Sequence, residues 1–326
     1  MMTAIDRQCL YCLGPLGEPI FRNVRDRLRV SNRLWTFRRC LDCGSALLDP
    51  MPSSEELLRA YPEHYAFDQA PQTGAFHHLL YRLESALFYH PIYRSSVRQV
   101  IRVTRLRSGR LLDVGGGTGH RTWFFRDAGF ECTVLDPDER PLRIARERFG
   151  LQTIQGLLEE IELPPGSFDL ITFYAVIEHL PDPTRTLQAA SRLLRPGGWI
   201  VALVPVLTGW ETRWCRLFWR HQVFEAPRHV GLPSPEGMRR LFARCGLELR
   251  RWEGNHLLDE AGIIALSVFS ASASAIACAS TSLFARGTRR AIGAMLTLLA
   301  IPFAILLHRI GYPGSAVFFA QKPPRT

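Results

Sequence analysis

LLDVGGGTG at residues 111–119 joins a short apolar run to a glycine-rich turn, and a helical pattern follows it from about His120. A buried strand that turns through glycines into a helix is where open α/β sheets bind ligands. A dinucleotide fingerprint needs Gly-x-Gly-x-x-Gly, whereas here the glycines stand at 115, 117 and 119 and an acid, Asp113, precedes them. An acid there disfavours a pyrophosphate and favours a ligand that carries positive charge, which glycines without Cβ atoms let the backbone approach closely.

A second acid, Asp136, ends the next apolar run, ECTVLD, where a carboxylate can accept hydrogen bonds from both hydroxyls of a ribose. The simpler alternative is a tight turn at the glycines and a helix cap at Asp136. The glycine loop, the acid before it and the acid after it stand in register, which favours a nucleoside ligand.

Apolar runs rich in β-branched residues alternate with helical patterns from Arg110 to about Trp252, which predicts a doubly wound α/β fold with a mostly parallel, seven-stranded sheet. The expected strands are RLLDVG, ECTVLD, QTIQG, FDLITFYAV, WIVALVPV, LELRRW and SAVFFAQK. The expected helices are residues 120–128, RPLRIARERFG, TRTLQAASRLL and SPEGMRRLFARCG, the last with a serine N-cap.

From about residue 105 to 255 the chain resembles the class I S-adenosylmethionine-dependent methyltransferases, a resemblance that rests on LLDVGGGTG, LDPDE, GSFDLITFYAVIEHL and RLLRPGGWIVALVP in this order. It implies that S-adenosyl-L-methionine is the cofactor. The cofactor-binding residues implied for the methionine part are Asp113, Gly115, Gly117 and Gly119; for the ribose, Asp136; for the adenine, Leu158 and Glu159; and near the methyl group, Tyr174 and Glu178.

Methyl transfer from a sulfonium needs chiefly a positioned acceptor and, for some acceptors, a base. His179, which follows Glu178, and His229 in APRHVGLPSPEGM are the catalytic candidates, and a role only in shaping the pocket is the alternative for each. FYAV at 173–176 differs from the tetrapeptide with which many amino-group methyltransferases hold a planar nitrogen. We therefore expect methylation at oxygen or carbon.

Cys9-x-x-Cys12 and Cys40-x-x-Cys43 have the spacing of two zinc knuckles, and four thiolates around one Zn²⁺ form a closed, structural site. This segment also resembles the zinc-binding part that precedes the methyltransferase domain in many bacterial sugar and natural-product methyltransferases. The start of the chain has no secretory pattern, which predicts a reducing, cytoplasmic location without disulfides.

A zinc ribbon before a methyltransferase also occurs in a family of rRNA methyltransferases, and the net charge of +10 suits RNA. The positive charges are dispersed, so nucleic acid is not the expected partner. Residues 210–228 interleave tryptophans with arginines and are read as a substrate lid, a membrane-interface surface, an RNA-stacking platform or a helix packed on the core.

Residues 256–312 form an apolar insertion before the last strand. The uncharged segments 261–285 and 291–307, separated by Arg286-Gly287-Thr288-Arg289-Arg290, each approach the roughly 20 residues that span a bilayer. A hairpin would translocate three arginines, so helices that lie in the membrane interface through 261–310 are favoured over spanning ones. Burial against the sheet or in a homo-oligomer interface is the alternative.

The predicted domains are a zinc knuckle (1–60), a helical connector (61–108) that Pro91 interrupts, a methyltransferase core (109–255), the apolar insertion (256–312) and a last strand with tail (313–326). With 47% apolar and 21% charged residues the chain is expected to fold. The predicted acceptor is a small molecule, glycan or lipid-linked intermediate. An RNA methyltransferase, or a non-catalytic membrane-associated protein that retains the fold, is the alternative function.

Overall fold

The computed structural model describes residues 8–26, 28, 30–61, 85–207, 225–262, 264–265, 283–311 and 313–324. The chain forms two compact units, each built from segments distant in the sequence. The first unit comprises 1–61, 205–238 and 254–316, and the second comprises 62–204, 239–253 and 317–326. Most of the tryptophan- and arginine-rich segment at 210–228 and most of the apolar segment at 261–285 lie outside the described residues.

The second unit contains a seven-stranded sheet in the order β10-β11-β8-β7-β4-β5-β6. Its strands are β4 (Gly109–Val114), β5 (Phe130–Asp136), β6 (Gln152–Gln155), β7 (Phe168–Tyr174), β8 (Leu194–Pro205), β10 (Glu248–Gly254) and β11 (Ser315–Gln321). The pairs β4–β5, β5–β6, β4–β7 and β7–β8 are parallel. The predicted α/β fold with a mostly parallel seven-stranded sheet is confirmed.

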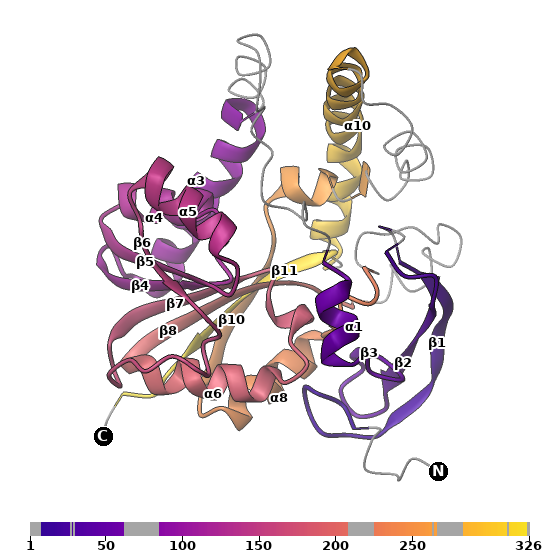
Figure 1. Cartoon of the computed structure of the whole chain (residues 1–326), viewed down its shortest axis with the longest axis horizontal. Helices are drawn as coiled ribbons and strands as arrows, with labels where there is room; N and C mark the ends of the chain where they lie inside the picture. Colours follow the sequence, from indigo (N-terminus) through magenta and orange to yellow (C-terminus); the bar gives the residue numbers. More distant parts are fainter. Residues whose placement is uncertain are drawn as a thin grey trace. The chain divides into compact units, whose positions relative to one another are not determined.

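Helices lie on both faces of this sheet (Figure 1): α4 and α5 cover one face and α6 covers the other. The helices of the unit are α3 (His90–Thr104), preceded by the π-turn η2 (Ser85–Tyr89), α4 (His120–Asp127), α5 (Glu139–Phe149), the short η3 (Ile177–His179), α6 (Pro183–Leu193) and α8 (Pro235–Arg244), which begins in the first unit. The predicted interruption at Pro91 falls in the first turn of α3, directly after η2, where a missing proline amide is tolerated.

The core of this unit is an apolar cluster between the sheet and the helices α3, α4 and α5. Leu111 and Leu170 on neighbouring strands are fully buried, and Phe125 of α4 and Leu142 of α5 pack in the same cluster. Because residues of a parallel sheet are covered on both faces, five of the seven residues of β7 are apolar, and Leu111, Leu112 and Val114 of β4 are buried. This core fixes the carboxyl ends of the strands, where the glycine loop begins.

The boundaries of β7 and β8 differ from the prediction for identifiable reasons. β7 ends at Tyr174, before Ala175-Val176, because Ala175 adopts a left-handed conformation (φ +56°) that no strand continues. β8 begins at Leu194, five residues before the predicted start at Trp199, because the turn at 197–198 pairs with the end of the chain: the Gly197 amide donates to the Lys322 carbonyl.

The first unit holds a four-stranded sheet in the order β1-β2-β3-β9. Its strands are β1 (Leu16–Arg25), β2 (Leu34–Cys40), β3 (Ala46–Leu48) and β9 (Gly231–Leu232), and α1 (Ser54–Arg59) follows β3. The three pairs are antiparallel. Helix α1 is capped by Ser53, whose hydroxyl accepts from the Glu56 amide while the Glu56 side chain accepts from the Ser53 amide, which together form a capping box.

The segment 225–238 packs on the N-terminal part within this unit. β9 pairs with β3, and the Ser234 amide donates to Ser45 Oγ over 2.9 Å. Ser234 is also the predicted N-cap of α8, because its Oγ accepts from the Gly237 amide at 2.9 Å. Residues near 45 and 234 therefore fold as one body.

The apolar insertion contains helical residues 257–262 and the long helix α10 (Leu283–Arg309). The expected break at 286–290 is absent, because α10 runs through these residues without interruption. Arginine is a good helix former, and one glycine inside a helix of this length costs only about 1 kcal/mol. Among the described residues, no helix combines the length and hydropathy needed to cross a bilayer.

Candidate functional site

The glycine loop connects β4 to α4 at the carboxyl edge of the seven-stranded sheet. Gly115, Gly117 and Gly119 all have positive φ values, between 55° and 69°, which side chains rarely adopt. A Cβ on Gly115 would lie 2.6 Å from Val176 Cγ2, and one on Gly119 would lie 2.5 Å from Leu151 Cδ1. A Cβ on Gly117 would meet no atom within 4 Å, so this glycine borders open space.

Asp113 lies in β4, two residues before the loop, and is 3% exposed. Its Oδ2 accepts from Thr122 Oγ1 at 2.5 Å and its Oδ1 accepts from Thr172 Oγ1 at 2.7 Å. Burial raises the pKa of Asp113, and the two hydroxyl hydrogen bonds oppose the shift. The carboxylate is therefore held inside the protein, where it fixes the loop's two flanking elements.

Asp136 ends β5, the strand beside β4. Its Oδ2 accepts from the Gly117 amide at 3.1 Å and its Oδ1 accepts from the Asp138 amide at 2.9 Å. Burial raises the pKa of this carboxyl group, and the two amides oppose the rise. A hydrogen bond thus joins Asp136 to Gly117, the central glycine of the loop. Each oxygen of the Asp136 carboxylate keeps a second lone pair that can accept from a ligand hydroxyl.

The predicted adenine-side residues lie in the turn after β6. Leu158 is buried, and Glu159 is half-buried with its Oε2 accepting from Thr186 Oγ1 at 3.2 Å. The turn is closed by a hydrogen bond from the Glu160 amide to the Leu157 carbonyl. Both residues are thereby held at the same edge of the sheet as Asp136, because β6 and β5 are parallel neighbours.

Tyr174 is the last residue of β7, the other neighbour of β4, and Glu178 and His179 follow in the short helix η3. Glu178 is buried, whereas His179 is half-buried at the end of the short helix η3. The left-handed Ala175 turns the chain here, and Val176 packs against Gly115. The loop after β7 and the glycine loop therefore touch each other.

Sequence reasoning missed Arg121, which lies in the first turn of α4. Its guanidinium carbon stands 4.1 Å from the ring centre of Tyr174 and 4.9 Å from that of Tyr93, and its Nη1 donates to Ser96 Oγ at 3.2 Å. These contacts hold a cation directly beside the glycine loop. No local motif marks it, because its partners come from α3 and β7.

His120, the first residue of α4, is also built into aromatic packing. Its ring stacks on Phe149 with 5.3 Å between centroids and meets Tyr93 edge-on at 5.2 Å. Burial, followed by the charge of His90, lowers the pKa of His120 to about 4. The imidazole is therefore neutral near pH 7 and contributes to the packing of the aromatic rings of Tyr93 and Phe149.

His229, the second catalytic candidate, belongs to the first unit and His179 to the second. His229 Nε2 lies 3.9 Å from Glu225 Oε2. Next to it, the fully buried Arg228 donates to Asp26 Oδ1 at 2.7 Å and to the Ala60 carbonyl at 2.8 Å. His229 therefore has one carboxylate near its ring, and its neighbour Arg228 is held by a buried ion pair.

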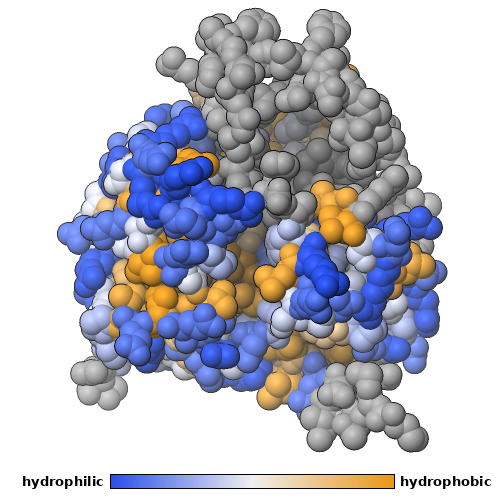
Figure 2. Space-filling view, viewed as in Figure 1, coloured by the Kyte–Doolittle hydropathy of each residue, from blue (hydrophilic) through white to orange (hydrophobic). Residues whose placement is uncertain are grey.

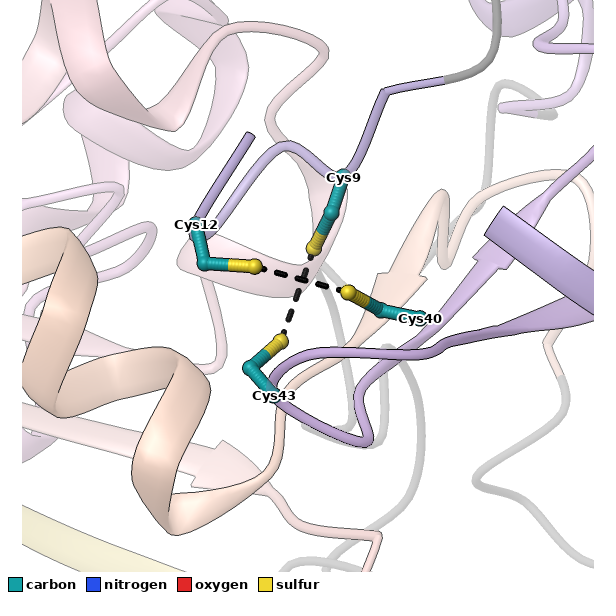
Figure 3. A group of neighbouring side chains, drawn as sticks. All are labelled: Cys9, Cys12, Cys40 and Cys43. Atoms are coloured by element: carbon teal, nitrogen blue, oxygen red, sulfur yellow. Dashed lines mark hydrogen bonds between the residues drawn. The ribbon is translucent and has the colours of Figure 1, made fainter. Parts of the chain in front are cut away.

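The four clustered cysteines converge in the first unit, as Figure 3 shows. All four sulfur atoms lie within 4.8 Å of one another, with 3.6 Å between Cys9 and Cys43 and 3.4 Å between Cys12 and Cys40. In a zinc tetrahedron with Zn–S bonds of about 2.3 Å the sulfur atoms stand about 3.8 Å apart. The cluster therefore fits Zn²⁺, and Cys9, Cys12, Cys40 and Cys43 are free thiols that could hold it.

The cysteine pairs also show why a cation would be favoured. Close contact with Cys43 and burial raise the pKa of Cys9, whereas the same contact lowers the pKa of Cys43 to about 5. Only one sulfur of this buried pair ionises readily by itself. A bound divalent ion would allow all four to ionise together. The Gly14 amide already donates to Cys12 Sγ at 3.3 Å.

Comparison with known proteins identifies one stretch of the chain. Residues 91–251 match the family described as "Methyltransferase domain". A ubiquinone/menaquinone biosynthesis C-methyltransferase from Methylobacterium nodulans is 37% identical over 123 residues, which cover 35% of this chain and 49% of that protein. A ubiquinone biosynthesis O-methyltransferase from Bordetella avium is 35% identical over 104 residues, which cover 29% of this chain and 42% of that protein.

The matched stretch spans about half or less of the length of these relatives. Among solved structures, one described as a possible histamine N-methyltransferase from Thermotoga maritima covers 75% of this chain and 95% of that chain, with 18% identity and a TM-score of 0.44. The family match contains the glycine loop, Asp136 and the loop after β7. Residues 91–251, just under half of the chain, are therefore similar to methyltransferase domains.

Proposed function

We propose that the chain transfers a methyl group from S-adenosylmethionine to an oxygen or carbon atom of a small-molecule acceptor. The family match over 91–251 and the relatives named as O- and C-methyltransferases support this function. The main observation in favour of this function is the hydrogen bond from the Gly117 amide to Asp136 Oδ2. It places a carboxylate beside a glycine turn that borders open space.

The residues at this edge fit the cofactor. Gly117 borders open space in a backbone conformation that favours glycine, so an amino-acid ligand can lie against it. Asp136 can accept from the ribose hydroxyls while it keeps its two amide hydrogen bonds. When bound, the cofactor supplies a methyl group that is already activated on a sulfonium.

The other residues of the site bind and orient. Leu158 and Glu159 would border the adenine, and Tyr174 and Glu178 would border the methyl end. Asp113 would act as a positioning residue, because Thr122 and Thr172 occupy its oxygens. Arg121, held between two rings, would place a positive charge where the cofactor's own carboxylate can reach it.

Loss of a proton from the acceptor would fall to a histidine. His179 lies in the short helix η3 that follows β7, and His229 Nε2 lies 3.9 Å from Glu225 Oε2. Each is a candidate base on chemical grounds. If one of them acts, its substitution by glutamine should lower kcat and remove the acidic limb of the pH–rate profile, while S-adenosylhomocysteine still binds.

The cysteine cluster is proposed as a structural zinc site. Four thiolates close the coordination sphere, so the ion would stabilise the first unit and take no part in the transfer. A glycan or a lipid-linked intermediate remains among the acceptors to be tried, alongside free phenols and quinone-like rings.

Calorimetry with S-adenosylhomocysteine tests the proposed function. Asp136→Ala should weaken binding at least about tenfold, which corresponds to one lost charge-assisted hydrogen bond. Asp169→Ala is the matched control, since Asp169 lies at the opposite end of β7 and accepts from the Arg110 amide at 2.7 Å. Unchanged affinity in Asp136→Ala, or no binding by the wild type, would overturn the proposal.

A further inference from the structure

One side of α10 packs inside the first unit. Ala304 and Leu307 are buried against Ala261 and Ile264, and Ala300 lies partly buried beside them. These positions recur every three or four residues and therefore form one stripe of the helix. The buried stripe fixes which side of α10 faces away from residues 257–265.

A second stripe of α10 is apolar and exposed. Its members are exposed by 43 to 69% and are Ile292, Met295, Leu299, Phe303, Leu306 and, just after the helix, Ile310. At about 100° per residue they fall within an arc of about 80°, and at 1.5 Å per residue they extend over about 27 Å. Six large apolar side chains in one row exceed the scattered exposed residues of an ordinary surface.

On the face seen in Figure 2, apolar areas of the described surface alternate with hydrophilic ones. The exposed leucines Leu41 and Leu58 of the first unit, for example, lie on separate elements. The row on α10 differs from these isolated leucines because all of its members but the last lie on one helix.

The charge of α10 matches an anionic lipid surface. The helix contains Arg286, Arg289, Arg290 and Arg309 and no acidic residue. A second copy of α10 would bring like charges together without an acid to pair with them. A helix with basic and no acidic residues is attracted by lipid phosphates, and acyl chains accept the apolar row.

We propose that α10 docks the protein on an anionic membrane surface, with the row from Ile292 to Ile310 in the interfacial layer. The helix would lie along the surface, because its opposite stripe is occupied by residues 257–265. This inference does not depend on the proposed methyl transfer, although a membrane-docked enzyme would meet acceptors with lipid tails.

Vesicle flotation with the full-length chain tests the docking surface. The vesicles contain phosphatidylcholine with about 30 mol% phosphatidylglycerol, and pure phosphatidylcholine vesicles measure the charge contribution. We expect wild type to float with the anionic vesicles and Leu299→Gln/Leu306→Gln to lose at least about tenfold in partition coefficient. Both leucines are more than half exposed, so the variant should keep its fold.

The matched control is Leu58→Gln/Leu87→Gln, which removes two equally exposed leucines outside α10 and should float like wild type. Binding of S-adenosylhomocysteine by all three proteins reports the second unit separately from docking. Wild type that does not float, or a Leu299→Gln/Leu306→Gln variant that floats unchanged, would overturn the proposal. A wild-type dimer in light scattering that this variant converts to a monomer, without flotation of either, would assign the row to a second copy.

Discussion

Thr172 of β7 stands directly opposite Asp113 of β4 in the parallel register, and its hydroxyl donates to Asp113 Oδ1 over 2.7 Å. The other oxygen of the same carboxylate accepts from Thr122 of α4. One buried acid therefore joins the two central strands to the helix that the glycine loop enters. Its role in the proposed site is exerted through these elements.

Thr172→Val should destabilise the second unit. The substitution keeps the shape of the side chain but leaves Asp113 Oδ1 without its buried donor, at a cost of about 1–3 kcal/mol in the free energy of unfolding. Urea denaturation measures the loss. Thr133→Val on the neighbouring strand is the control, because its hydroxyl makes only an exposed contact of 3.4 Å with Gln152. Equal stabilities of the two variants would contradict the importance of the Asp113 contact.

Gly117→Ala should weaken S-adenosylhomocysteine binding more than it lowers stability. The new Cβ enters open space, so no packing is lost, and the left-handed backbone adds about 1 kcal/mol of strain. That Cβ would occupy the side where the ligand is proposed to lie. Calorimetry and thermal unfolding, measured on the same protein, separate the two effects.

Gly197→Ala provides the matched control for strain. Gly197 also has positive φ (77°) and no atom within 4 Å of an added Cβ, but it lies in the first part of β8. Gly197→Ala should lower the free energy of unfolding about as much as Gly117→Ala does, and it should leave the affinity for S-adenosylhomocysteine unchanged. If both variants bound the ligand like wild type, the loop would not be the cofactor site.

Chelation should remove zinc from the first unit and lower its melting temperature. Wild-type protein purified without chelator should contain one zinc ion per chain by elemental analysis, and Cys12→Ser should contain much less. Cys245→Ser is the control, since Cys245 is a buried free cysteine of the second unit. Metal-free wild type with an unchanged melting temperature would exclude the zinc site.

The sequence was most informative where the chemistry is local. Cys9-x-x-Cys12 and Cys40-x-x-Cys43 each lie on one short turn, so spacing alone predicted that their sulfur atoms would converge. The strands of the parallel sheet were predictable because their residues are buried on both faces. β7, for example, has apolar residues at five of its seven positions.

The sequence was least informative where partners lie far apart. Arg228 pairs with Asp26, 202 residues away, and the Arg121 contacts combine three elements. No local pattern marks such pairs. The continuous helix through Arg286–Arg290 was missed for a different reason: charges between two apolar runs were interpreted as a turn, whereas arginine is compatible with a helix interior.

Arg228→Met should unfold the first unit at lower denaturant concentration. The arginine is fully buried, and its loss would leave the Asp26 carboxylate buried without its cation, which typically costs about 3–5 kcal/mol. Arg59→Met is the control, because Arg59 pairs with Glu55 in full exposure and should cost less than about 1 kcal/mol. A similar stability for Arg228→Met and Arg59→Met would show that the buried pair contributes nothing net.

Glu260 should make the first unit less stable as pH rises toward neutrality. This buried carboxyl group accepts from the Gly314 amide at 2.6 Å and from the Ser315 amide at 3.3 Å, yet burial raises its pKa from 4.5 to about 7. Between these two values the folded protein keeps a proton that the unfolded chain has released. The stabilisation is therefore complete below pH 4.5 and is lost as pH rises through 7, on the order of 3 kcal/mol in all.

Urea denaturation of wild type and Glu260→Gln across this range measures it, because the variant cannot titrate and the difference between the two should shrink at low pH. Glu55→Gln, an exposed carboxylate in α1, should follow the wild-type curve. A wild-type curve that runs parallel to that of Glu260→Gln would show that Glu260 titrates alike in the folded and unfolded chain.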